Sequence, residues 1–184
     1  MTSECPVVET ERLILRPFRE DDVDPYTAIL QAPPVRASLH LPDDVGRYEA
    51  WVGIAQQLGQ WELRGTGQWA LEAKETGAFV GRAGMHWPAR ADWPGIEIGW
   101  TLHPDEWGKG YATEAGAAAI DYAFAHHDVD ALYSVILPEN AASQAVARRL
   151  GFTLWQTRAL SHLPEMDHGI WRLRRADFGG FSGR

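Results

Sequence analysis

Apolar and polar positions follow two different periods along the chain, which predict a mixture of helices and strands. Apolar residues recur at i, i+3, i+4 and i+7 from Trp51 to Leu58, the spacing of an amphipathic helix over residues 47–63. Short apolar runs bounded by glycine or proline predict strands instead. These predicted strands cover residues 12–16, 68–72, 78–86, 95–102, 132–137, 153–157 and 169–173. Further helices are predicted at residues 23–30, ended by Pro33–Pro34, at 112–126 and at 141–150.

The order of these elements indicates the fold class. The three strands between residues 68 and 102 are joined by short turns, so we expect them to pair antiparallel. The helix at 112–126 separates two strands, and this strand–helix–strand order implies a parallel pair. Gly151 permits a left-handed end to the last helix, so that Phe152 can fold back onto Val146 or Ala147. The prediction is an α/β fold with a mixed sheet of about six or seven strands flanked by about four helices.

Composition excludes several classes of protein. The 184 residues are 45% hydrophobic and 23% charged, which suits one globular domain. The net charge is -8, and the sequence shows no basic patch of the kind that nucleic-acid binders have. Neither a signal sequence at the start nor an apolar run of ~20 residues is visible, so we expect a cytoplasmic protein without a membrane anchor. The single cysteine, Cys5, excludes an internal disulfide and a cysteine-cluster zinc site.

The segment GWTLHPDEWGKGYATEA, residues 99–115, carries the clearest functional signal. A strand ends near Leu102, a loop follows with Gly108 and Gly110, and a helix begins near Ala112. A helix N-terminus exposes unpaired N–H groups, and glycines let the main chain approach an anion closely. The segment has neither the Gly-Lys-Ser/Thr of a P-loop nor the Gly-x-Gly-x-x-Gly of a dinucleotide fold. From the residues alone, an ordinary glycine-containing loop remains the alternative.

This segment resembles the acetyl-CoA-binding motif of the GNAT superfamily, Arg/Gln-x-x-Gly-x-Gly/Ala. Gly110 and Ala112 occupy the last two positions, and Trp107 replaces Arg/Gln, a form similar to that of the RimJ/RimL-type branch. Residues 10–18 resemble the opening strand of that branch, and residues 140–152 resemble its second motif, Asn-x-x-Ser…Leu-Gly-Phe. The resemblance covers about residues 10–175 and implies a single acyl-CoA N-acyltransferase domain over residues 1–184. It implies acetyl-CoA contacts at Thr101, Leu102, Trp107, Gly108, Lys109, Gly110, Tyr111, Ala112, Thr113, Asn140 and Ser143.

Two of these residues have a structural alternative. The side chain of Asn140 can cap the helix that follows it, and this role is compatible with a contact to the cofactor. The ammonium group of Lys109 can reach a phosphate or lie in solvent. By the resemblance, the main-chain N–H near Leu102 holds the acetyl carbonyl and stabilises the oxyanion.

Acyl transfer to an amine needs a base, because only the free amine attacks a thioester. Alternation places Glu97 on the same face of its strand as Gly99 and opposite Ile96 and Ile98. A carboxylate in a central strand is costly to bury unless it is paired or functional. Glu97 also matches a Glu-Ile-Gly-Tyr/Trp segment of the family. We therefore predict that Glu97 is the base, with a hydrogen-bonded structural carboxylate as the alternative and Glu72 and His86 as the next candidates.

The resemblance also suggests the proton donor and the reaction. Ser143 is expected near the sulfur of coenzyme A, where its hydroxyl could protonate the leaving thiolate; a solvated serine is the alternative. The predicted function is transfer of acetyl from acetyl-CoA to a primary amine, either a protein N-terminal α-amine or a small molecule, by direct attack in a ternary complex. Another donor such as succinyl-CoA, or a non-catalytic acyl-CoA-binding module, remains open.

The acceptor itself has no readable signature. Its pocket is expected from residues 35–41, 61–68 and 86–95, in which we find no recognisable code. We predict no metal site, because the adjacent His126 and His127 point to different sides of a helix and suit its end. The sequence does not determine the oligomeric state, and a homodimer is compatible with it.

Overall fold

One mixed sheet organises the molecule. The computed structural model describes residues 4–161 and 163–181, and within them the sheet has eight strands in the order β1-β2-β3-β4-β5-β6-β8-β7. Every neighbouring pair is antiparallel except β5 and β6, which are parallel. The strands are β1 (Val8–Glu9), β2 (Leu13–Arg16), β3 (Gln68–Ala73), β4 (Phe79–His86), β5 (Glu97–Leu102), β6 (Ala131–Ile136), β7 (Thr153–Leu160) and β8 (Leu163–Arg174).

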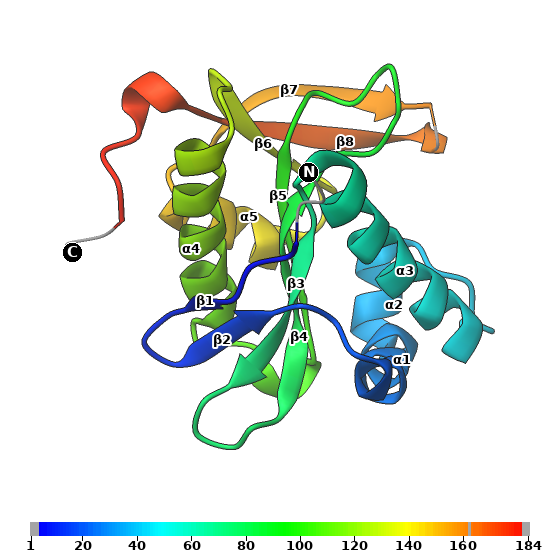
Figure 1. The fold of residues 1–184 in the computed structure, drawn as a ribbon. Helices are drawn as coiled ribbons and strands as arrows, with labels where there is room; N and C mark the ends of the chain where they lie inside the picture. The colour runs from blue at the N-terminus through cyan, green and yellow to red at the C-terminus, as the bar shows by residue number, and fades with distance from the viewer. Residues whose placement is uncertain (1–3, 162, 182–184) are drawn as a thin grey trace.

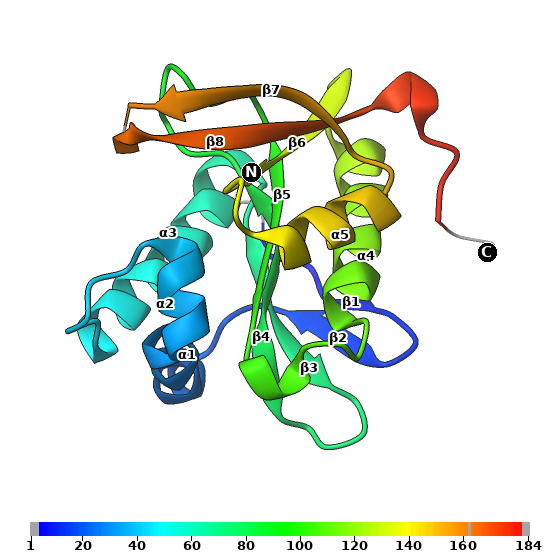
Figure 2. The ribbon, with the colours of Figure 1, turned by 180° about the vertical axis from the view of Figure 1, so that it is seen from behind.

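Helices cover the two faces of this sheet in separate groups (Figures 1 and 2). The group on one face is α1 (Val23–Gln31), α2 (Pro33–Leu39) and α3 (Arg47–Arg64). The other face carries α4 (Tyr111–His126) and α5 (Ala141–Arg149). Each group encloses its own buried cluster, the larger of which packs α4 and α5 against the sheet. The sheet therefore presents one face to α4 and a second, separate face to α1–α3.

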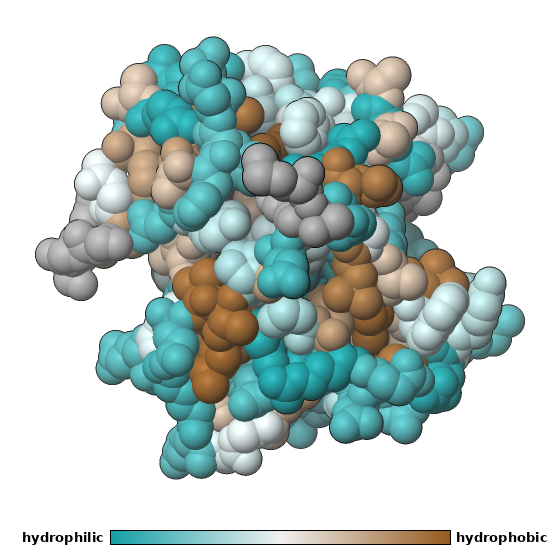
Figure 3. Space-filling view, viewed as in Figure 1, coloured by the Kyte–Doolittle hydropathy of each residue, from teal (hydrophilic) through white to brown (hydrophobic). Residues whose placement is uncertain are grey.

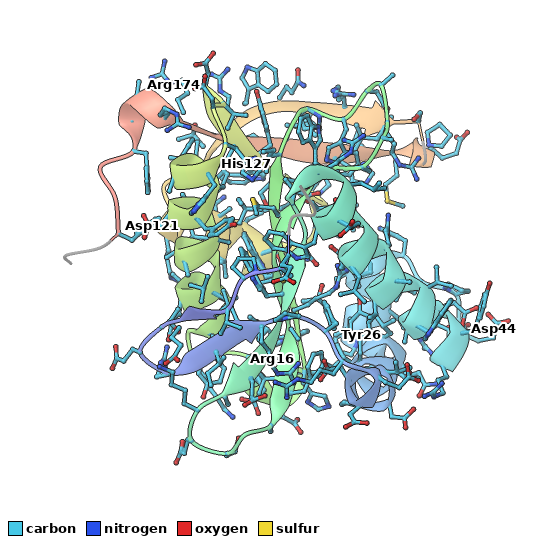
Figure 4. All side chains as sticks on the ribbon, viewed as in Figure 1. Arg16, Tyr26, Asp44, Asp121, His127 and Arg174 are labelled. Atoms are coloured by element: carbon cyan, nitrogen blue, oxygen red, sulfur yellow. The ribbon has the colours of Figure 1, made fainter. Side chains whose placement is uncertain are left out.

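Small residues allow α4 to lie close to its neighbours. Ala115, Ala119 and Ala123 are completely buried, and a Cβ atom on Gly116 would lie 2.7 Å from a methyl group of Leu150, the residue that follows α5. Gly116, Ile120, Ala123 and Phe124 form the buried stripe of α4. His127 follows the helix and is only partly buried, with Nε2 3.2 Å from the carbonyl oxygen of Gly65 (Figure 4).

The α/β class and the parallel pair are confirmed, and the structure adds elements that the sequence pattern missed. The prolines that end α1 also begin α2, because a proline in the first helical turn needs no hydrogen-bond partner for its missing N–H. The predicted turn after α5 is confirmed, since Gly151 has φ 88° and the N–H of Phe152 donates to Ala147 O. The β7–β8 hairpin is longer than predicted. The short strand β1 was not predicted.

Hydrophobic residues on the face seen in Figure 3 reach the surface in separate patches among polar ones. Among the described helices, none combines the length and the apolar character that crossing a membrane requires.

Candidate active site

The predicted glycine loop leads directly into the N-terminus of α4. After β5, a short 3-10 turn (Pro104–Glu106) is followed by Gly108 with φ 78° and Gly110 with φ 86°, conformations that favour glycine. The first main-chain bond of α4 runs from the N–H of Glu114 to Gly110 O, 3.0 Å. Within the described residues, no hydrogen bond is made by the N–H groups of residues 108–110 or by those of the first helical turn, residues 111–113. Unpaired donors at a helix N-terminus suit a phosphate or diphosphate.

Residues in the turn between β1 and β2 hold this loop through a hydrogen-bond network that sequence reasoning missed. Arg12 donates from Nη1 to Lys109 O at 2.7 Å and from Nε to Glu114 Oε2 at 2.7 Å. The other oxygen of Glu114 accepts from the N–H of Arg12 at 2.7 Å and from the hydroxyl of Thr10 at 2.6 Å. Burial opposes ionisation of Glu114, but these donors outweigh it and hold its pKa below the ordinary value. The loop is thus held in place before any ligand arrives.

Two side chains of the loop are already engaged. The indole N–H of Trp107, at the position of the family's Arg/Gln, donates to Leu102 O at 3.0 Å and braces the loop against β5. The ammonium group of Lys109 lies 2.9 Å from Glu106 Oε2, and this hydrogen bond raises the pKa of the lysine. Main-chain amides are therefore the principal donors that the loop offers to an anion.

The parallel strands β5 and β6 separate beside this loop. Their only register pair in the described chain is Glu97 with Tyr133, where the N–H of Tyr133 donates to Ile96 O at 3.0 Å. A continuing parallel ladder would send the next N–H of β6, that of Val135, to the carbonyl of Ile98. It donates instead to Glu97 Oε1, at 3.3 Å. The carboxyl group takes the place of a ladder acceptor, and the strands diverge beyond it.

This divergence leaves one side of β5 unpaired. The N–H of His103 donates to Val80 O on β4, and the alternation of an antiparallel ladder then gives the N–H of Thr101 to β4 as well. The N–H groups of Trp100 and Leu102 point the opposite way, toward β6. They therefore face the opening between the strands, next to the glycine loop.

Glu97 has an electrostatic environment that differs from that of an ordinary surface carboxylate. Its side chain is mostly buried in the sheet, and this burial raises its pKa to about 8. The N–H of Val135 and the positive charge of Arg82 oppose the rise without cancelling it. A carboxyl group with such a pKa can take up and release a proton near neutral pH.

The other two candidate bases are engaged elsewhere. Glu72 Oε2 accepts from Nε of Arg16 at 2.6 Å, and the same arginine binds both oxygens of Asp22 at 2.8 Å. Figure 4 shows Arg16 near the end of the sheet that adjoins α1. Gln60 accepts from the N–H of Trp87 through Oε1, which orients its Nε2 as a donor to Nδ1 of His86 at 2.9 Å. The accepting nitrogen of a neutral His86 is thereby occupied.

Asn140 and Ser143 lie at the start of α5. The side-chain oxygen of Asn140 accepts from the N–H of Ser143 at 3.0 Å, which is the N-cap role expected from the sequence. The cap uses only Oδ1, so the amide nitrogen of Asn140 is still available as a donor. Ser143 is partly exposed in the first turn.

The segment at 86–95, predicted to contact the acceptor, is hydrogen-bonded to the β7–β8 hairpin. Asp92 accepts from the N–H of Ser161 at 2.6 Å and from its hydroxyl at 3.0 Å, and Arg158 donates to Asp92 O at 2.6 Å. The main-chain bond from Ser161 is the largest cause of the lowered pKa of Asp92. Residues that are distant in sequence thus form one wall beside the ends of β4 and β5.

No group of three or more histidine, cysteine or acidic side chains is placed to hold a metal ion within residues 4–161 and 163–181. His126 and His127 diverge as predicted: Nδ1 of His126 lies 2.9 Å from Tyr122 O, whereas His127 contacts Gly65.

Unpaired main-chain N–H groups at a helix N-terminus, beside two parallel strands that separate around a carboxyl group, are the arrangement that the sequence resemblance leads us to expect in the class of acyl-CoA-dependent transferases. Comparison with known proteins agrees with this class. The sequence profile of the acetyltransferase (GNAT) domain matches residues 12–153. The chain belongs to this family, and it is an acetyltransferase.

Three similar proteins illustrate the relationship. An acetyltransferase from Agrobacterium tumefaciens has a similar structure, with a TM-score of 0.78 and 33% identity over 94% of this chain and 96% of that one. The uncharacterized N-acetyltransferase YoaA of Bacillus subtilis is 27% identical over 80% of this chain and 82% of its own length. RimJ from Mycobacterium smegmatis, solved with a coenzyme A disulfide, shares the fold with a TM-score of 0.69 and 21% identity, covering 91% of this chain and 84% of its own.

Proposed function

We propose that this protein transfers acetyl from acetyl-CoA to a primary amine, with Glu97 as the base and the glycine loop as the diphosphate site. The observation that carries the proposal is the row of unbonded main-chain N–H groups at residues 108–113, next to a strand separation that contains Glu97. RimJ, which shares the fold, binds coenzyme A in its solved structure. The Trp-Gly-Lys-Gly-Tyr-Ala segment further supports a place in the RimJ/RimL-type branch.

Each residue would contribute one step to direct transfer. Main-chain donors at residues 108–113 bind the diphosphate, and the donor side chain of Asn140 contacts the pantetheine arm between β5 and β6. Thr101 and Leu102 border the thioester. The N–H of Leu102 faces the opening and would stabilise the negative charge that develops on the carbonyl oxygen.

Two side chains would transfer protons, Glu97 as the base and Ser143 as the acid. The amine nitrogen forms a bond to the carbonyl carbon, and Glu97 takes the proton that this nitrogen loses. The bond from carbon to sulfur then breaks, and Ser143 gives a proton to the leaving thiolate. The pairing of Glu72 with Arg16 and of His86 with Gln60 favours Glu97 over both other candidates.

The base must be ionised to act, so its raised pKa predicts a pH dependence. Glu97 is protonated at low pH and becomes competent as the pH rises through about 8. An α-amino group titrates near 7.7–8.0, close to the same value, so acceptor and base become active together. Turnover should therefore rise between pH 6.5 and roughly 8.5 and then level off.

The test is release of free coenzyme A from acetyl-CoA with a panel of amines and peptides, followed by mass detection of the acetylated product. Succinyl-CoA in a parallel series measures donor preference. Glu97→Gln should lower kcat by more than tenfold while the affinity for acetyl-CoA stays similar. Tight acetyl-CoA binding without turnover across the panel would favour the non-catalytic alternative, and unchanged turnover in Ser143→Ala would reject Ser143 as the acid.

A further inference from the structure

Polar side chains form a row on the sheet face that lies opposite α4. The register places Gln68, Gly84 and Gly99 directly opposite one another across β3, β4 and β5, and pairs Arg82 with Thr101 in the next row. Because side chains alternate between the faces of a strand, these residues share a face with Glu97. The hydrophobic residues between them in sequence, such as Ile98 and Ala83, belong to the core under α4.

Gly99 connects the two ends of this polar row. A Cβ atom at Gly99 would lie 2.8 Å from Gln68 Nε2 and 3.9 Å from Glu97 Oε1. The missing side chain therefore allows the amide of Gln68 and the carboxyl of Glu97 to approach the same point. Gln68 also accepts a hydrogen bond from Nη1 of Arg82 through its other terminal atom. Arg82, Gln68 and Glu97 thus follow one another in space along one face of the sheet.

Arg82 has no acidic partner within ion-pair distance among the described residues. It donates to the amide oxygen of Gln68 and interacts with Tyr26, whose ring centroid is 5.6 Å from the guanidinium carbon. Burial raises the pKa of Tyr26, and the charge of Arg82 and its hydrogen bond to the hydroxyl group oppose this rise. The charge of Arg82 also opposes the burial that raises the pKa of Glu97, with which Arg82 forms no ion pair. Its Nε atom is buried and makes no hydrogen bond, although the side chain as a whole is partly exposed. By contrast, Arg16 on the same face is neutralised by both Asp22 and Glu72. A partly buried guanidinium without a counter-ion is unfavourable and can be stabilised by a bound anion.

Glu97 does not neutralise the guanidinium of Arg82 at neutral pH. Burial raises the pKa of Glu97 to about 8, so its carboxyl group is mostly protonated at pH 7. The protein as a whole carries a net charge of -8, which disfavours anionic ligands in general. An anion that reaches this face therefore needs a local cation, and Arg82 is the cation that Gln68 links to the same row as the proposed base.

We propose that the acceptor is a small amine that also carries a carboxylate, and that Arg82 binds this carboxylate while the amine lies at Glu97. This inference rests on the proposed function and narrows its acceptor class. It disfavours a protein N-terminus whose first residue presents a neutral amide in place of the carboxylate. Gln68 acts as a positioning residue that orients the guanidinium and separates the two binding points.

The first test uses the wild-type protein and a matched series of acceptors. Phenylalanine, phenylalaninamide and phenethylamine differ in the presence and charge of the carboxyl group, and equivalent series can be built on other side chains. With acetyl-CoA saturating, kcat/KM should be at least tenfold higher for the acid than for its amide in the series that fits best. The comparison is conservative, because the amide has more free amine at neutral pH. Equal or better use of the amides in every series would overturn the inference.

The second test follows the same ratio in variants. Arg82→Gln should reduce the acid-to-amide ratio by about tenfold, whereas Arg82→Lys should recover part of it by restoring the positive charge. Arg47→Gln is the matched control, since Arg47 is an exposed arginine on α3 that pairs with Asp24 and Glu20. A ratio that changes equally in the Arg82 and Arg47 variants would mean that net charge alone is responsible, and the inference would be wrong.

Failure of the inference and failure of the proposed function give different results. Turnover of neutral amines without a preference for acids contradicts only the inference. No turnover with any amine contradicts the proposed function, and calorimetry with the same acid and amide then decides the inference by binding. The acid should bind more tightly to wild type than to Arg82→Lys, and equal affinities for acid and amide would overturn it.

Discussion

The pKa of Glu97 can be tested by protein stability, independently of any substrate. Its value of about 8 in the folded protein lies well above the ordinary 4.5. Between these two pH values the unfolded chain ionises Glu97 and the folded protein does not, so the stability of the fold falls as the pH rises. The substitution Glu97→Gln removes this titration but keeps an oxygen that can accept from the N–H of Val135.

The magnitude follows from the pKa difference. Each pH unit between 4.5 and 8 costs the folded wild type about 1.4 kcal/mol relative to a side chain that does not titrate. At pH 7 the sum is roughly 3 kcal/mol, and the partial exposure of the side chain reduces the expected effect to about 2 kcal/mol. Below pH 4.5 Glu97 is protonated in both the folded and the unfolded wild type, so the difference in stability between wild type and Glu97→Gln should reach its minimum. Above pH 8 it should reach a plateau.

Urea unfolding of wild type and Glu97→Gln at pH 5, 6, 7 and 8.5 measures this difference directly. Glu75→Gln, on the exposed turn between β3 and β4, controls for loss of a carboxylate without burial. The gain in stability of Glu97→Gln over wild type should increase with pH, while the control stays flat. A difference that does not depend on pH would refute the burial argument and, with it, the assignment of a base active near pH 8.

Three further predictions concern the proposed cofactor site. Gly110→Ala should cost about 1 kcal/mol of stability and weaken acetyl-CoA binding, because φ is 86° and the new Cβ would lie 3.2 Å from Nη2 of Arg12. Calorimetry measures the binding. The control is Gly59→Ala in α3, where a new Cβ would have no neighbour within 4 Å. Glu114→Gln should weaken acetyl-CoA binding several-fold by releasing Arg12 from the loop, and unchanged binding would show that the loop holds its shape without this pair. Asn140→Asp should keep the helix cap but weaken acetyl-CoA binding through its negative charge. Asn140→Ala should weaken this binding and also lose about 1 kcal/mol of stability in urea, because the cap is removed. Equal losses of stability and of binding in the two variants would exclude a separate cofactor contact.

The sequence predicted those features that depend on neighbouring residues. Gly108 and Gly110 mark the loop because each needs a positive φ, and Asn140 marks a helix start because its side chain reaches an N–H three residues away. The alternation of β5 correctly placed Glu97 on the face away from Ile96 and Ile98, both of which are buried in the core. Whether Glu97 is the base is still a prediction.

Features that depend on long-range packing were not predictable in this way. Arg12 and Glu114 are 102 residues apart, and no local pattern indicates that one holds the other. The only available signal was the presence of both residues within segments that resemble the family. Arg82 was read as part of an apolar strand, because its distinguishing property is that it forms no ion pair with an acidic side chain of the two adjacent strands. Neither period nor propensity reports that property.

Glu97 has two roles, a structural one between β5 and β6 and a proposed catalytic one as the base. Its Oε1 accepts the N–H of Val135 that would otherwise continue the ladder to Ile98, so the proposed base also lies at the point where β5 and β6 separate. Glu97→Ala would therefore remove the proposed base and also free that N–H to restore the ladder, which would narrow the opening between the strands. Glu97→Gln keeps the accepting oxygen and changes only the proton chemistry. A loss of acetyl-CoA affinity in Glu97→Ala but not in Glu97→Gln would separate these two roles, whereas equal affinities in both variants would show that the strands stay apart without this carboxyl group.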